Sequence, residues 1–225
     1  MRALNIPTGE NKVITVIANL KGGSGKSTVA FNLAIWLKMK GEVVAAYDLD
    51  PQQTLHDVAL VRKEDGIEPE LLIGVINSND VCSTLSAQSG QVLVDVGAAN
   101  MDAMKAAISI ANRVIVPVQP SQPDVWATQR FLKIINDACG DNNSPELIAF
   151  INRADTHHAV KESDEAEEAL KMLDKFRVIP YRLCQRTSFR RTLSEGLSIF
   201  ELSGKSKSTE EFDRLAHALY PDLIN

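Results

Sequence analysis

The sequence predicts an α/β fold built on a doubly wound, mostly parallel sheet of about seven strands flanked by helices. Two observations predict it. Short runs of consecutive apolar residues alternate with helical stretches, and a glycine-rich loop follows the first of these runs. With 225 residues the chain is long enough to bury one substantial core. We therefore expect residues 1–225 to form a single domain without internal repeats.

The expected strands share apolar runs without polar alternation, which is typical of strands covered on both faces. They are expected at residues 13–18, 42–48, 71–75, 91–96, 113–118, 147–152 and 176–179. A helix is expected at residues 29–37, where apolar residues recur at the spacing of one helix face, and further helices at 187–196 and 209–220. Ligands of such sheets bind beyond the carboxyl ends of the strands.

Composition and charge narrow the possible classes of protein. The chain is 44% hydrophobic and 24% charged, as globular domains are. A net charge of −5 means that any nucleic-acid binding must come from a local basic face. We expect no membrane-spanning helix, because no run of about 18 apolar residues exists. Residues 1–7 lack the apolar core of a signal peptide. About a dozen residues precede the first strand, too few for a helix-turn-helix.

The cysteines indicate a cytosolic protein with reduced thiols, because they are odd in number and widely spaced. They are Cys82, Cys139 and Cys184. The histidines lack carboxylate or cysteine neighbours at ligand spacing, so we expect them at the surface or in packing. They include His157, His158 and His217. Trp36 and Trp126 are expected in the core.

The glycine-rich loop between the first strand and the first helix has the composition of a phosphate cradle. Its residues are Gly22, Gly23, Ser24, Gly25, Lys26, Ser27 and Thr28. Glycines let backbone N–H groups turn toward anionic oxygens, and the helix N-terminus adds partial positive charge. Lys26 can bridge the outer phosphates, and the Ser27 hydroxyl can ligate Mg²⁺. A flexible glycine turn is the alternative, but it does not explain Lys-Ser at the start of a helix.

Carboxylates end two of the expected strands. Asp48 and Asp50 lie two residues apart on an extended segment, so both can face a nucleotide at the loop. An acidic group there can hold a Mg²⁺-bound water or orient the attacking water. Asp95 ends the strand at 91–96, where an aspartate can hold Mg²⁺ directly or through water. The alternative role for Asp50 and Asp95 is to cap the helices that follow them.

The loop departs from the common phosphate-loop pattern in a specific way. Leu20 stands where a glycine is usual, and a second lysine, Lys21, opens the motif. This Lys-Gly-Gly-Ser-Gly-Lys-Ser motif resembles the deviant Walker A of the ParA/MinD family of P-loop ATPases. The likeness covers nearly the whole chain. It includes an Asp-x-Asp-Pro-Gln segment at 48–52 and a segment at 116–126 similar to that of small, ParF-like plasmid-partition ParA proteins.

One segment departs from that family. ParA proteins usually continue with prolines after the aspartate that corresponds to Asp95, whereas Val96-Gly97-Ala98 follows it here. Gly97 can still let the backbone approach the γ-phosphate.

The resemblance implies ATP and Mg²⁺ as cofactors and a role for each site residue. Lys21 and Lys26 act in catalysis, with Lys21 reaching across a dimer to the partner's nucleotide. Asp50 orients or activates the hydrolytic water, and Asp48 supports the magnesium shell, which Ser27 and Asp95 complete. The base is contacted by two segments at strand ends. These are Asn152-Arg153 and Pro180-Tyr181.

A basic segment lies in the last third of the chain and could bind DNA phosphates without reading sequence. Its candidate residues are Arg186, Arg190, Arg191, Lys205 and Lys207. A solvated charged face is the alternative for any single residue. The resemblance implies nonspecific binding to nucleoid DNA by an ATP-bound homodimer. A MinD-type membrane role is disfavoured, because the helix at 209–220 has an acidic start.

The expected function is therefore that of a slow ATPase that partitions a cargo. A partner protein, either a centromere-binding protein or a cargo adaptor, would stimulate hydrolysis. A plasmid is the favoured cargo, and a protein assembly such as a carboxysome or a chemoreceptor array is the alternative. A nucleotide-gated scaffold with negligible hydrolysis is a third hypothesis. A nitrogenase-reductase-like role would need paired cluster-ligating cysteines.

Overall fold

The predicted sheet is present, and every strand pair within it is parallel. The computed structural model describes residues 12–140, 144–157 and 161–223. The strands are β1 (Val13–Asn19), β2 (Val44–Asp48), β3 (Ile73–Gly74), β4 (Gln91–Gly97), β5 (Arg113–Val118), β6 (Glu146–Ala154), β7 (Phe176–Val178) and β8 (Leu183–Cys184). Their order is β3-β2-β4-β1-β5-β6-β7, and β8 pairs with β6. The predicted fold class is confirmed. The expectations for residues 1–7 and His158 lie outside the described residues.

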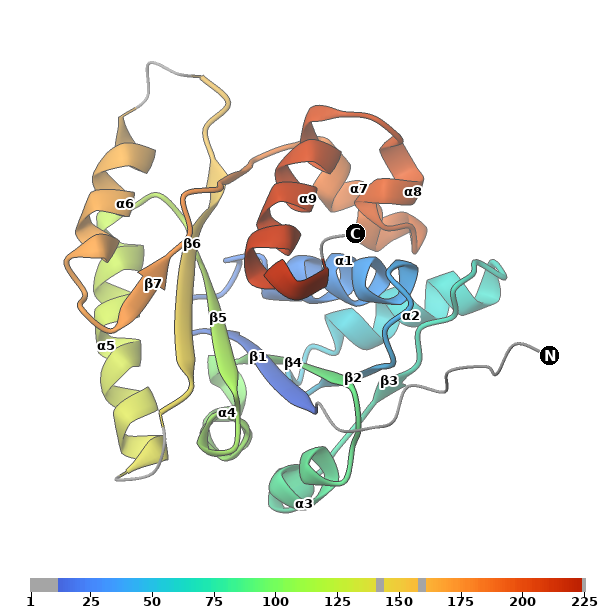
Figure 1. Cartoon of the computed structure of the whole chain (residues 1–225), viewed down its shortest axis with the longest axis horizontal. Helices are drawn as coiled ribbons and strands as arrows, with labels where there is room; N and C mark the ends of the chain where they lie inside the picture. Colours follow the sequence, from blue (N-terminus) through green and yellow to red (C-terminus); the bar gives the residue numbers. More distant parts are fainter. Residues whose placement is uncertain (1–11, 141–143, 158–160, 224–225) are drawn as a thin grey trace.

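Helices cover both faces of this sheet (Figure 1). They are α1 (Lys26–Met39), α2 (Thr54–Glu64), α3 (Val81–Ser86), α4 (Met101–Ser109), α5 (Gln122–Cys139), α6 (Glu162–Lys171), α7 (Thr187–Glu195), α8 (Ile199–Ser203) and α9 (Lys207–Leu219). Short 3₁₀ turns occur at Ser78–Asp80, Ala98–Asn100 and Pro221–Leu223. Within the described ranges, no helix has the length and apolar character needed to cross a bilayer.

The core has two layers, one on each face of the sheet. Helices α3, α4, α5 and α6 pack on one face, where Met104, Phe131 and Leu170 are buried. Helices α1, α2, α7, α8 and α9 pack on the other, where Phe31 and Phe212 are buried. Because both faces are covered, the strands need apolar residues at successive positions, as the sequence shows.

The register places the ends of the central strands at one edge of the sheet. Asn19 at the end of β1 pairs with Gly97 at the end of β4. Asp48 at the end of β2 pairs with Asp95, also on β4. The phosphate loop and the two carboxylate-bearing strands therefore converge on one edge, as expected for a doubly wound sheet.

The two tryptophans differ in environment. Trp36 is buried, as predicted, and its Nε1 donates a hydrogen bond to Asp213 Oδ1 at 3.2 Å. The prediction for Trp126 was wrong, because 51% of it is exposed. Helix α5 buries the face that carries Val125, Thr128 and Phe131, and Trp126 lies off that face. The three cysteines carry free thiols, as predicted.

Arg62 joins helix α2 to the α7–α8 segment from a fully buried position. Its guanidinium donates two hydrogen bonds to the Glu201 carboxylate at 2.7 and 2.9 Å. It also donates to the carbonyl oxygens of Gly196 and Pro69, each at 2.9 Å. The buried guanidinium is therefore paired with one carboxylate and two carbonyl oxygens, because a buried cation is costly without such partners.

Candidate functional site

The phosphate loop runs from the end of β1 into α1, and its conformation depends on glycine. Gly23 and Gly25 have positive φ values of 75° and 90°, which only glycine adopts without strain. Lys26 opens α1, and its buried side chain points back over the loop, where Nζ donates to the Lys21 carbonyl oxygen at 3.4 Å. Because backbone N–H groups at a helix start are unpaired within the helix, this loop is suited to an anion.

Two asparagines, from β1 and β6, fix the loop. Asn19 is fully buried, donates to the Pro117 carbonyl oxygen at 2.8 Å and accepts from the Lys21 backbone N–H at 2.9 Å. Asn152 at the end of β6 donates to the Ser24 carbonyl oxygen at 2.6 Å. A Cβ atom on Gly25 would lie 2.3 Å from Asn152 Nδ2, so glycine is required there for this approach. The Asn152 side chain therefore lies directly against the loop.

Strand β2 ends at Asp48, and Asp50 follows two residues later, so both aspartates lie at the edge of the sheet that carries the phosphate loop. Their contacts differ. Asp48 accepts hydrogen bonds from the backbone N–H groups of Asp50, Leu55 and His56, at 3.0, 2.9 and 3.1 Å. Asp48, not Asp50, therefore fixes the start of α2. The role of Asp48 around magnesium stays a prediction. Burial raises the pKa of Asp48, and these three N–H groups partly offset that effect.

Asp50 lies over the end of β4. A Cβ atom on Gly97 would come within 2.1 Å of Asp50 Oδ2, so the carboxylate occupies the space that a side chain at position 97 would fill. The absence of a side chain at Gly97 thus lets Asp50 approach β4. The predicted role of Gly97 toward a γ-phosphate is a separate matter and stays a prediction.

Asp95 is the most perturbed acid of the site. Its side chain is fully buried, and neither carboxylate oxygen has a hydrogen-bond partner among the described residues. Burial raises its pKa to about 7; the nearby Ser27 hydroxyl lowers it in part, although its geometry falls outside that of a hydrogen bond. A buried carboxylate beside a hydroxyl supplies the hard oxygen ligands that Mg²⁺ prefers. Ser27 and Asp95 therefore fit a magnesium ion.

We expect Asp95 to make the nucleotide-free and magnesium-free protein less stable as pH rises from about 4 to about 7. In this window the folded state keeps a proton that the unfolded chain has released, because the folded pKa is the higher one. The effect is at most about 4 kcal/mol, from about three pKa units. Urea unfolding at pH 5 and pH 8 measures it. The free energy of unfolding of Asp95→Asn, relative to that of wild type, should be higher at pH 8 than at pH 5.

The exposed Asp102 provides the control for this experiment. Asp102→Asn should follow the wild-type pH profile. Parallel profiles for wild type and Asp95→Asn would show that Asp95 does not hold its proton in the folded state.

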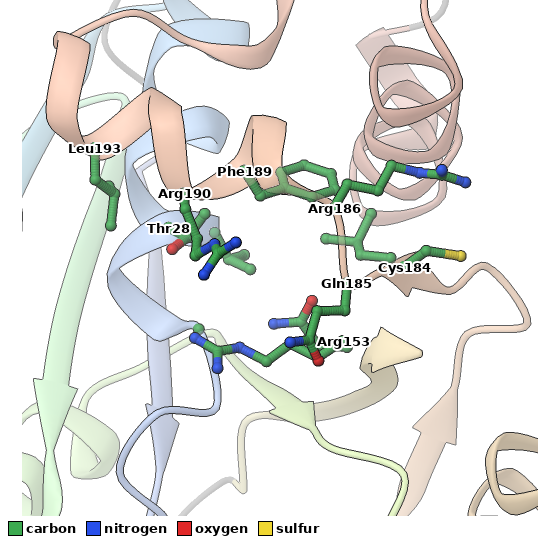
Figure 2. Close-up of a pocket in the computed structure, with 12 residues that line it drawn as sticks. Thr28, Arg153, Cys184, Gln185, Arg186, Phe189, Arg190 and Leu193 are labelled. Atoms are coloured by element: carbon green, nitrogen blue, oxygen red, sulfur yellow. The ribbon is translucent and has the colours of Figure 1, made fainter. Parts of the chain in front are cut away.

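Two adjoining cavities lie beside the loop. The larger, about 290 Å³, is polar and is lined by Lys26, Ser27 and Asp50 among others. The smaller, about 150 Å³, has an apolar wall that includes Phe189 and Leu183 (Figure 2). The two cavities share four lining residues, and so they lie against one another. These are Gly25, Thr28, Arg153 and Leu193. A polar cavity next to an apolar one suits a ligand with a charged part and a planar apolar part.

The structure brings together only part of the predicted base site. Asn152 and Arg153 line the smaller cavity, and Arg153 adopts a left-handed φ of 58°. Pro180 and Tyr181 line neither cavity, and both are exposed. The segment just after them, residues 183–186, lines the smaller cavity instead. Strand β8 runs parallel to β6 and pairs with its end, beyond the part that pairs with β7, so it places this segment beside Asn152.

The five predicted DNA-binding residues lie in different environments. Arg186 is held by the Glu211 carboxylate, and exposed Arg191 pairs with Glu195 at 2.8 Å. Arg190 lines the smaller cavity. Lys205 and Lys207 are exposed and form no ion pair with a carboxylate of the described residues. The basic set is therefore not one continuous cationic face.

Sequence reasoning missed several residues that shape this site. Asn19 is an ordinary strand-end residue by pattern, and only the contacts show that it fixes the loop. Phe189 and Leu193 lie four residues apart on α7, a spacing that predicts core residues, and they also line the smaller cavity. The four-residue spacing that predicts one buried helix face could not reveal that this face also closes a cavity.

The comparisons with known proteins agree with this geometry. The sequence model of the family described as "CobQ/CobB/MinD/ParA nucleotide binding domain" matches residues 15–199. The maintenance of carboxysome distribution protein A of Halothiobacillus neapolitanus is 27% identical over 217 residues, which cover 94% of this chain and 98% of that protein.

Two solved structures have the same fold. Apo McdA of Cyanothece superposes with a TM-score of 0.74 at 22% identity, covering 93% of this chain and 100% of that chain. A plasmid partition protein of Borrelia burgdorferi bound to AMPPNP superposes with a TM-score of 0.72 at 19% identity, covering 95% and 100% of the two chains.

Proposed function

Because the chain belongs to the CobQ/CobB/MinD/ParA nucleotide-binding family, we propose that it is an ATPase that works as a nucleotide-dependent dimer. ParA and MinD proteins are ATPases, and this chain carries the residues that such chemistry needs. Two chains would sandwich two Mg·ATP molecules, bind DNA in that state and release it after hydrolysis. The observation that carries the proposal is the convergence of Lys26, Ser27 and Asp95 beside a loop that also holds a second lysine, Lys21.

The residues around the loop have complementary tasks in this proposal. Lys26 and the backbone N–H groups of the loop bind the outer phosphates. Ser27 and Asp95 hold the magnesium ion, which neutralises charge that develops on the phosphates. Asp50 orients the attacking water through its carboxylate. Because no further general base is evident, turnover is expected to be slow until a partner protein accelerates it.

Dimerisation gives the nucleotide its role as a switch. Lys21 lies at the start of the loop, and its ammonium would reach the nucleotide of the second chain. The γ-phosphate then contributes binding energy across the interface, so its loss destabilises the dimer. ATP and ADP thus favour different assemblies of the same fold.

DNA binding is proposed to use exposed cations on α7 and near the start of α9. These two helices are joined where Ser188 Oγ donates to Ser208 Oγ at 2.9 Å. Lys205 and Lys207 lie just before and at the start of α9, and Arg191 is exposed on α7. Contacts from such residues to phosphates carry no sequence information, so binding would be nonspecific and weakened by salt.

A plasmid is the cargo suggested by the likeness of residues 116–126 to ParF-like proteins. A second candidate is a protein assembly, because the carboxysome distribution protein matches nearly the full length of this chain. The same ATPase cycle serves both. A gene encoding a centromere-binding protein beside this one would favour a plasmid, and a gene encoding a cargo adaptor would favour the assembly.

We expect the wild-type protein to form dimers and retain nonspecific DNA with ATP, but not with ADP or without nucleotide. Light scattering measures the dimer, and filter retention measures DNA binding. Lys21→Ala should keep most of the ATP affinity, because the fold and the contacts of Lys26 to its own phosphates remain. It should lose both dimerisation and DNA retention, because the contact of Lys21 to the nucleotide of the second chain is gone. Equal DNA retention in all three nucleotide states would contradict the proposal. Dimerisation without phosphate release, with or without DNA, would favour a nucleotide-gated scaffold instead.

A further inference from the structure

Arg190 lies on α7 but faces the smaller cavity. It lines that cavity opposite Thr28 and Val29 of α1. Figure 2 shows its side chain directed from α7 toward Thr28, while the Arg153 side chain approaches the same space from β6. Three arginines therefore line one small cavity, with Arg186 as the third.

The neighbouring arginines on and before α7 differ from Arg190 in their ion pairs, although Arg186 lines the same cavity. Arg186 donates to both carboxylate oxygens of Glu211, and Arg191 pairs with Glu195 four residues further along α7. Arg190 forms no ion pair with any carboxylate of the described residues. Two cations that line one cavity without a carboxylate partner gain most from an anion placed between them.

The position of the cavity identifies which anion fits. Thr28 and Gly25 line both cavities and so mark their junction, next to the start of α1. If the nucleotide binds as proposed above, its outer phosphates lie toward Lys26 and its base lies against the apolar wall. The group between them is the α-phosphate with the ribose. Arg153 adds a second sign of function, since a residue other than glycine at φ 58° stores backbone strain.

We propose that Arg190 is a nucleotide-positioning residue that binds the α-phosphate from α7, opposite Arg153. This inference rests on the proposed function, because it assumes a nucleotide in the two cavities. It moves Arg190 from the predicted DNA-binding set to the nucleotide site. Arg190 and the adjacent Arg191 are both exposed, but only Arg190 lines the cavity.

The test compares Arg190→Ala, Arg190→Lys and the control Arg130→Ala, at an exposed arginine of α5 on the other face of the sheet. A fluorescent ADP analogue measures affinity directly, and competition with unlabelled AMP and adenosine resolves which part of the ligand is contacted. Arg190→Ala should weaken ADP and AMP about tenfold, the loss expected for one charge-assisted hydrogen bond. Adenosine should compete equally well against all variants. Arg190→Lys should restore part of the loss, and Arg130→Ala should match wild type.

Each alternative outcome has a distinct meaning. An equal loss for adenosine and ADP would place Arg190 against the base and overturn the α-phosphate contact. Unchanged ADP affinity with lost ATP-dependent DNA retention would make Arg190 a DNA-binding residue, and would leave the proposed function intact. Failure of the wild-type protein to bind the ADP analogue would overturn the proposed function itself. Far-ultraviolet circular dichroism shows whether each variant keeps its helices.

Discussion

Lys26→Ala is expected to lower the affinity for ATP by about a hundredfold or more, because it removes the buried ammonium at the phosphate loop. The side chain is held over the loop by the Lys21 carbonyl oxygen, so its charge is already directed toward the space for the outer phosphates. A preorganised charge loses little entropy on binding, which is why a large effect is expected. Isothermal titration calorimetry with Mg·ATP measures the loss.

Lys38→Ala is the control for this variant, because Lys38 lies in the last turn of the same helix. It should bind ATP as wild type does. If Lys26→Ala also binds ATP with wild-type affinity while it remains folded, the assignment of the loop as a phosphate cradle is wrong.

Asp50→Ala is expected to reduce ATP hydrolysis by about a hundredfold or more, as for loss of a residue that orients or activates the attacking water. ATP binding and dimerisation should persist, so the ATP-bound dimer accumulates. The variant removes a carboxylate that lies against Gly97 without touching the Asp48 contacts that start α2. Phosphate release and size-exclusion chromatography with light scattering measure the two effects separately.

The matched control is Asp57→Ala, an exposed aspartate in the first turn of α2. It should hydrolyse ATP at the wild-type rate. Wild-type turnover in Asp50→Ala would remove Asp50 from catalysis, and loss of ATP binding would show that it acts on the loop instead.

The sequence was sufficient to predict the sheet because each long strand is apolar at successive positions. Strands β1, β4, β5 and β6 are found within two residues of their predicted bounds. The edge of the sheet was harder to predict. Strand β3 has two residues, and β8 was missed, because so short a segment carries no periodic signal.

In the site, too, features made of contiguous residues could be predicted, and contacts between separated residues could not. The phosphate loop was predictable because its glycines, lysine and serine are contiguous. The roles of Asp48 and Asn152 depend on contacts across 7 and 128 residues of sequence, respectively, and no local pattern encodes them. Trp126 was wrongly placed in the core because average burial says nothing about which face of a helix a residue occupies.

The buried Arg62 has a mechanical consequence for the two ends of the nucleotide site. Asp48 fastens the first turn of α2 to the loop that carries Asp50, and Arg62 fastens its last turn to the end of α7. Pulling α2 away from the α7–α8 segment would leave the guanidinium without its Glu201 carboxylate, at a cost of about 3–5 kcal/mol. We therefore expect α2 and the α7–α8 segment to shift together. A displacement that starts beside Asp50 would then also move α7, whose Phe189 lines the smaller cavity.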